Sequence, residues 1–131
     1  MPQRRRRVWM IMWLAVMGAA GSLCRYWLDG YVQDFTGSRF PWGIVVVNLA
    51  GCFAFGFVFP LAEGPMHITG TTRQIILTGF MGAFTTFSTF TFQTVDLLEK
   101  GQWADALCNV AVQLICGIGL MFVGLALGRL V

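Results

Sequence analysis

Charged residues are spaced so that they leave four long apolar stretches along the chain. The stretches cover about residues 8–28, 40–62, 74–95 and 106–128. A helix rises about 1.5 Å per residue, so roughly 20 apolar residues cross the core of a bilayer, which is about 30 Å thick. Each stretch is long enough, the first of them if the charged end of Arg25 reaches the membrane interface. The pattern predicts four transmembrane helices.

The segments that connect these stretches are too short to fold alone, so residues 1–131 are predicted to form a single transmembrane domain. Composition supports this prediction. Hydrophobic residues make up 56% of the chain and charged residues 11%, whereas a soluble domain has about 25% charged residues. We therefore expect an all-α integral membrane protein whose outer faces contact lipid.

A basic tail, residues 1–7, precedes the first stretch and contains Arg4 to Arg7. These arginines favour an orientation with both termini inside the cell. Without the tail, lysine and arginine are nearly balanced between the two sides of the membrane. A secretory signal peptide is the alternative for the start of the chain, but its removal would leave an odd number of spans.

The third stretch has an unusual composition. Hydroxyl and phenyl side chains alternate through its centre, residues 79–92, which lacks leucine and begins with Gly79 and Gly82. Glycine, threonine and phenylalanine are weak helix formers, so we expect the third helix to be broken near its centre. Irregular backbone at membrane depth occurs only where protein covers it or a wet cavity adjoins it. A break would therefore mark a site.

No Asp, Glu, Lys or His lies near the centre of any stretch. Proton-coupled antiporters normally need an ionisable group there. An enzyme is not expected either, because the single histidine, His67, is placed in a solvated loop and no nucleophile and base can be paired. The cysteines show no metal-binding spacing. We expect no nucleic-acid partner.

Neutral hydrogen-bond donors lie inside the apolar stretches instead. They are Asn48 in the second stretch, Thr85, Thr86, Ser88, Thr89, Thr91, Gln93 and Thr94 in the third, and Asn109 and Gln113 in the fourth. Such groups suit an anion that must lose its water, and hydrogen bonding between helices is the alternative. For Asn48 we favour a functional role, because a buried amide in an apolar helix needs a partner. Asn109 and Gln113 are four residues apart and share one helix face.

The phenylalanines and glycines of these stretches have helical spacings. Phe80, Phe84 and Phe87 form a stripe that usually indicates packing, while Phe87 and Phe90 lie one turn apart with hydroxyl groups between them. The edge of a phenyl ring is positive, so ring edges can contact a small anion. The fourth stretch carries glycines at 124 and 128, a spacing that predicts close packing against another helix.

Three segments resemble the Fluc (CrcB) family of fluoride channels. Residues 79–90 resemble the family's GxxGxxTTFSTF pattern, residues 46–51 its VNxxG element, and residues 18–26 its glycine-rich run that ends in Arg-Tyr. The likeness covers the first three stretches in order. The fourth has Asn109 and Gln113 where the family tends to carry hydroxyl residues, and the arginine tail is a second departure.

The resemblance implies roles for individual residues. Phe87 and Phe90 match the paired rings whose edges contact fluoride, and Asn48 matches the asparagine of the pore. Gly82 and Thr85 match the helix break whose backbone carbonyls hold a structural sodium ion shared by two subunits. The family also implies an antiparallel homodimer, with chains inserted in both orientations.

The resulting prediction is a fluoride-selective channel that exports fluoride passively across the bacterial inner membrane. Arg25, near the end of the first span, is predicted to raise the local anion concentration at a vestibule or to anchor the helix at the interface. Two alternatives remain open, a small multidrug antiporter and a membrane scaffold that transports nothing. Asp29, Asp34, Glu63, Asp96, Glu99 and Asp105 all lie at or beyond the ends of the spans, which argues against the antiporter.

Overall fold

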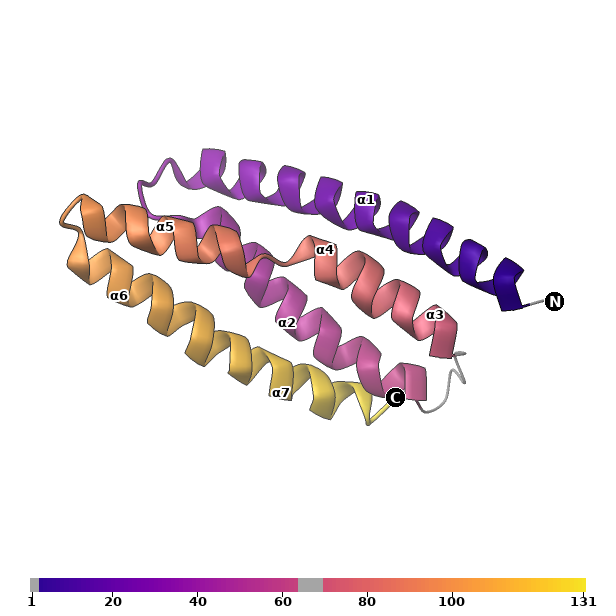
Figure 1. Ribbon diagram of the computed structural model, residues 1–131. Coiled ribbons are helices and arrows are strands. Elements are labelled where there is room, and N and C mark those ends of the chain that lie inside the picture. Colours follow the sequence, from indigo (N-terminus) through magenta and orange to yellow (C-terminus); the bar gives the residue numbers. More distant parts are fainter. Residues whose placement is uncertain (1–2, 64–69) are drawn as a thin grey trace.

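The computed structural model describes residues 3–63 and 70–131, and the regular structure in those ranges is helical (Figure 1). Four helical segments there are long and apolar enough to cross a membrane, namely Gln3–Thr36, Trp42–Glu63, Gly70–Glu99 and Trp103–Gly128. The predicted all-α fold with four membrane-spanning helices is confirmed. His67, expected in a solvated loop, lies outside the described residues.

The first two spans are each one α-helix, α1 (Gln3–Thr36) and α2 (Trp42–Glu63). Helix α1 is about 51 Å long at 1.5 Å per residue, so it extends well beyond a hydrocarbon core. Residues 3–7 of the predicted tail form its first turns, because arginine is a good helix former. Gly37, at a φ of 56°, ends this helix in the left-handed conformation that glycine adopts without strain.

The third and fourth spans are each built from several helical segments. The third contains α3 (Gly70–Gln74), the π-helix η1 (Ile75–Met81), α4 (Gly82–Phe84) and α5 (Phe87–Glu99). The fourth contains α6 (Trp103–Ala111), the π-helix η2 (Val112–Cys116) and α7 (Gly117–Gly128). Short π-helical segments inside α-helices are rare and are frequent at functional sites.

Helix α2 lies in the interior of the bundle, where it packs against α1, α7 and the third span. Figure 1 shows α1 on one side of the third span and the fourth span on the side of α2 away from α1. Ile44, Val45 and Val47, in the first half of α2, are almost completely buried. The second span therefore supplies both the centre of the core and the position from which Asn48 reaches its neighbours.

Helices α2 and α7 pack closely through glycines, as the spacing in the fourth span predicts. A Cβ atom on Gly124 would meet the backbone carbonyl of Phe53, and one on Gly128 would meet that of Phe57. Gly56 of α2 lies equally close to the carbonyl of Met121. Without a hydrophobic force between helices in lipid, this close approach of the two backbones provides the packing energy.

We expect Gly124→Ala to destabilise the protein by about 1–3 kcal/mol, because the added methyl group meets backbone atoms of α2 that cannot move independently. Gly119→Ala is the matched control on the same helix, since a Cβ atom there has no neighbour within 4 Å. Thermal unfolding of the two purified variants in detergent measures the difference. Equal melting temperatures for the two variants would contradict this account of the α2–α7 contact.

Candidate functional site

The site is built around two residues, Thr85 and Thr86, that separate α4 from α5. Both have extended backbone, with φ and ψ of −84° and 157° at Thr85 and −149° and 113° at Thr86. The amide and the hydroxyl of Thr85 both donate to the Met81 carbonyl, at 3.1 and 3.0 Å. Helical hydrogen bonding therefore stops at Thr85 and starts again at Phe87.

Thr86 begins the next helix as its N-cap. Its side-chain oxygen accepts from the backbone amide of Thr89 at 3.2 Å, which satisfies one of the free donors at a helix start. The same oxygen lies 3.0 Å from the Thr89 hydroxyl and 3.3 Å from the Ser88 hydroxyl. Three predicted site residues thus form one hydroxyl cluster at the start of α5.

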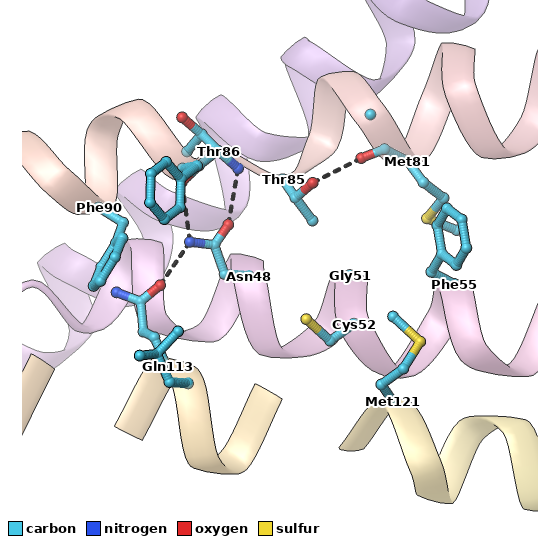
Figure 2. Close-up of a pocket in the computed structure, with 13 residues that line it drawn as sticks. Asn48, Gly51, Cys52, Phe55, Met81, Thr85, Thr86, Phe90, Gln113 and Met121 are labelled. Carbon is cyan, nitrogen blue, oxygen red and sulfur yellow. Dashed lines mark hydrogen bonds between the residues drawn. The ribbon is translucent and has the colours of Figure 1, made fainter. Parts of the chain in front are cut away.

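Asn48 of α2 is paired with the backbone of Thr86 (Figure 2). The Thr86 amide, which would donate to the Gly82 carbonyl in a continuous helix, donates to Asn48 Oδ1 at 2.8 Å. Asn48 Nδ2 in turn donates to the Thr86 carbonyl at 3.1 Å. One side chain therefore satisfies both main-chain polar groups of an extended residue, which is what a buried interruption requires.

The glycine one turn after Asn48 makes room for this contact. A Cβ atom on Gly51 would collide with Cγ2 of Thr85, so any larger residue would push α2 away from the third span. Sequence reasoning did not assign this role to Gly51. The signal was available, because Asn48 and Gly51 are three residues apart and share a helix face.

Asn48 also contacts the fourth span. Asn48 Nδ2 donates to Gln113 Oε1 at 2.6 Å, and Gln113 Nε2 donates to Asn109 Oδ1 at 2.8 Å. Asn109 is completely buried and donates through Nδ2 to the Thr94 hydroxyl at 2.9 Å. Asn109 and Gln113 do share a face, as predicted, but that face continues the hydrogen bonding of Asn48. Thr94 was predicted as a neutral donor of the third stretch but was not assigned to the site.

A cavity of about 290 Å³ adjoins this network. Its lining includes the polar side chains of Asn48, Thr86 and Gln113 and the rings of Phe87 and Phe90, and apolar residues such as Phe55 and Met121 form the rest. The described residues that line the cavity carry no formal charge. The space is therefore a mainly apolar one with a few neutral hydrogen-bonding groups at one side.

The two rings of the predicted pair have different environments. Their centroids are 5.5 Å apart with an interplanar angle of 53°. Phe90 is 8% exposed, whereas Phe87 is 75% exposed in the single chain. Phe80 and Phe84 stack on each other at 5.9 Å and are not among the residues that line this cavity.

Four of the remaining predicted positions lie outside the lining of the cavity. Asn109 lies behind Gln113, and Ser88 and Thr89 lie beside Thr86. Arg25 lies on α1, a helix from which no described residue lines the cavity. Gly82, the first residue of α4, and Thr85, which follows its last residue, both line the cavity.

Comparison with known proteins assigns the chain to a family. The sequence profile of the family described as "CrcB-like protein, Camphor Resistance (CrcB)" matches residues 12–125. This chain belongs to the CrcB family. Its match includes every predicted site residue on all four spans, among them Asn109 and Gln113 in the fourth span, for which the sequence motifs had offered no match.

Several curated relatives of this CrcB family member are similar along nearly their whole length. A protein of Solidesulfovibrio magneticus is 51% identical over 118 residues, which is 90% of this chain and 94% of the relative. Proteins of Nitratidesulfovibrio vulgaris and Nitrosococcus oceani are 48% and 46% identical over 92% of this chain, with 98% and 97% of the relatives covered. All three are named "Fluoride-specific ion channel FluC".

We expect Asn48→Ala to destabilise this CrcB protein by about 1–3 kcal/mol for each group that loses its partner, because the Thr86 amide and carbonyl are then left unpaired. Cys52→Ala is the control, since Cys52 lies one turn further along α2 and lines the same cavity. Unfolding of both variants in detergent provides the measurement. An Asn48→Ala protein as stable as Cys52→Ala would show that Asn48 does not hold the interruption.

Proposed function

We propose that this protein is a fluoride-selective channel of the bacterial cytoplasmic membrane, which lets fluoride leave the cell and so limits its toxicity. The observation that carries the proposal is the near full-length similarity to three proteins named as fluoride-specific ion channels. The four membrane-spanning helices supply the multi-pass architecture that such a channel needs. No catalytic role is proposed.

The polar groups of the site support passive movement of an anion. Amide and hydroxyl groups can replace the water of fluoride without adding a fixed charge that would hold the ion too tightly. The acidic residues of the described chain lie towards the ends of the spans, for example Glu63 at the end of α2 and Asp105 in the first turn of α6. A proton-coupled antiporter would need a carboxylate at depth. Fluoride therefore moves down its own gradient.

The proposed path follows the cavity. The amide of Asn48 and the hydroxyls of Thr86, Ser88 and Thr89 act as donors, with the edges of Phe87 and Phe90 facing the ion. Gln113 continues the polar track, and Asn109 supports it from behind. Larger halides fit such closely spaced donors poorly. Arg25 attracts anions to a vestibule at the end of the predicted apolar stretch 8–28.

We propose further that the interruption at Thr85 and Thr86 is a functional break of the third span, covered by a second copy of the chain. Gly82 is exposed in the single chain although it lies one turn before the extended residues Thr85 and Thr86, and irregular backbone is not left facing lipid. An antiparallel homodimer would bring this region of both copies to its symmetry axis. The weak charge bias outside the arginine tail supports insertion in both orientations.

A structural sodium ion fits this break. The Thr86 amide donates to Asn48 and not to the Gly82 carbonyl, and Thr85 is extended. Carbonyls of α4 therefore lack N–H donors that a continuous helix would supply. Carbonyl oxygens are the ligands that hard cations prefer. The carbonyls of Gly82 and Thr85 would hold the ion, which would supply positive charge and fix the two copies together.

The experiment that tests the channel is ion efflux from liposomes that contain the purified protein. With no Asp, Glu, Lys or His near the centre of any apolar stretch, fluoride efflux should be electrogenic and should be driven by a potassium diffusion potential without a proton gradient. Chloride efflux should be far slower. Efflux that stops when the proton gradient is collapsed at constant voltage would indicate an antiporter, and the absence of any flux would indicate a scaffold.

The rings are tested by aliphatic substitution. Phe87→Ile and Phe90→Ile should cost less than about 1.5 kcal/mol of stability, because the volume is nearly conserved, yet both should reduce fluoride flux severely. Asn48→Asp should also reduce it, by placing a carboxylate in the path of an anion. Phe80→Ile and Phe84→Ile are the controls and should be milder. Normal flux through both Phe87→Ile and Phe90→Ile would remove the rings from the path.

The dimer is tested by counting subunits. Single-molecule photobleaching of singly labelled protein in bilayers should give two steps per active particle, because one chain leaves the interruption open to lipid. Particles that conduct fluoride and bleach in a single step would show that a monomer suffices.

A further inference from the structure

Three side-chain amides and one hydroxyl form a continuous chain of hydrogen bonds across three spans. The Thr94 hydroxyl donates to the Phe90 carbonyl at 2.8 Å and accepts from Asn109 Nδ2. The chain continues through Gln113 to Asn48, which accepts from the Thr86 amide. One end of this amide chain is thus a backbone acceptor and the other a backbone donor.

These two ends determine the orientation of every amide between them. A carbonyl only accepts, so the single hydrogen of Thr94 points to Phe90, and its oxygen is left to accept from the NH₂ group of Asn109. Asn109 Oδ1 then faces Gln113 Nε2, and Gln113 Oε1 faces Asn48 Nδ2. Reversing one amide alone would bring two NH₂ groups or two oxygens together. The orientations are therefore coupled.

This arrangement leaves Asn48 without a free donor for an anion. One N–H of Nδ2 is directed to the Thr86 carbonyl at 3.1 Å and the other to Gln113 Oε1 at 2.6 Å. A fluoride ion can bind to Asn48 only by replacing one of these oxygens. Thr86 Oγ1 and the Thr86 backbone are tied to the start of α5, whereas Gln113 is a side chain that lines the cavity. Gln113 Oε1 is the oxygen that can be replaced.

We propose that Gln113 Oε1 occupies the fluoride position on Asn48 at rest, and that fluoride displaces it by reversing the amide chain. In the reversed state Gln113 turns its NH₂ group towards the ion, so that Asn48 and Gln113 both donate to it. Gln113 Oε1 then accepts from Asn109, and Asn109 Oδ1 accepts from the Thr94 hydroxyl, which rotates away from Phe90. Every side-chain amide keeps a partner in both states, and the Phe90 carbonyl alone gives up its side-chain donor.

The inference rests on the proposed conduction of fluoride. It gives Asn109 and Gln113 of the fourth span a role in the response of the site to the ion. Asn109 is completely buried and lies outside the cavity lining, so it is a positioning residue and does not itself contact the ion. Thr94 is the terminal group that can serve both states, because a hydroxyl both donates and accepts. If Asn109 served only to pack the helices together, its side-chain amide would not respond to fluoride.

The chain contains only two asparagines, Asn48 and Asn109, which makes a direct test available. Protein labelled with ¹⁵N-asparagine in lipid nanodiscs should show two side-chain amide signals in an NMR spectrum. Fluoride should shift both signals saturably, with the same half-saturating concentration, and chloride at equal ionic strength should shift neither. Thr94→Val should abolish the shift of Asn109, because valine can neither accept from nor donate to it.

Thr91→Val is the matched control. The Thr91 hydroxyl donates to the Phe87 carbonyl at 2.9 Å in the same way as Thr94 does to Phe90, but it lies outside the amide chain, so both shifts should persist. An Asn109 signal that stays fixed while Asn48 responds would overturn the reversal, as would a full Asn109 response in Thr94→Val. Fluoride efflux measured in parallel distinguishes failure of the amide reversal from failure of the proposed channel function. Efflux with a fixed Asn109 signal overturns the reversal alone, whereas no efflux overturns the proposed function as well.

Discussion

The pairing of the Asn48 side chain with the Thr86 backbone is the interaction on which the rest of the site depends. A helix satisfies its own main-chain polar groups, and an interruption at membrane depth loses that satisfaction. Here the amide and the carbonyl of Thr86 both find partners on one side chain from another span. The third span can therefore pass through Thr86 with both main-chain groups of that residue paired, and the cavity forms beside it.

The same pairing connects the fold to the chemistry of the site. Asn48 projects from the most buried part of α2, next to Val47, so its position is held by the core of the bundle. Gly51 allows Thr85 to lie against α2, and Thr86 starts α5 with its hydroxyl among those of Ser88 and Thr89. The amides and hydroxyls beside the cavity are thus neutral and held in place by hydrogen bonds to neighbouring helices.

The sequence allowed the four spans to be predicted because charges are costly in lipid, so their absence over about 20 residues is a strong signal. The weak helix formers at residues 79–92 drew attention to the segment where the helices end and restart. The π-helices η1 and η2 were not foreseen, since their hydrogen bonds depend on packing and leave no clear pattern in the sequence.

The partners of the site residues were harder to predict than the residues themselves. Asn48 was expected to need a partner, but spacing along one helix does not say which span provides it. Only the fold brings Gln113 within 2.6 Å of Asn48 and Thr94 within 2.9 Å of Asn109. The different exposures of Phe87 and Phe90 likewise depend on how α5 is rotated, which a stripe of aromatic residues leaves open.

Amide hydrogen exchange at Thr86 tests most directly whether Asn48 holds the interruption that forms the site. In the wild-type protein the Thr86 amide should be protected by its bond to Asn48 Oδ1, as the Thr85 amide is by its bond to Met81. In Asn48→Ala, Thr86 should lose its protection while Thr85 keeps it. A Thr86 amide that stays protected in Asn48→Ala, or that exchanges freely in the wild type, would contradict the account.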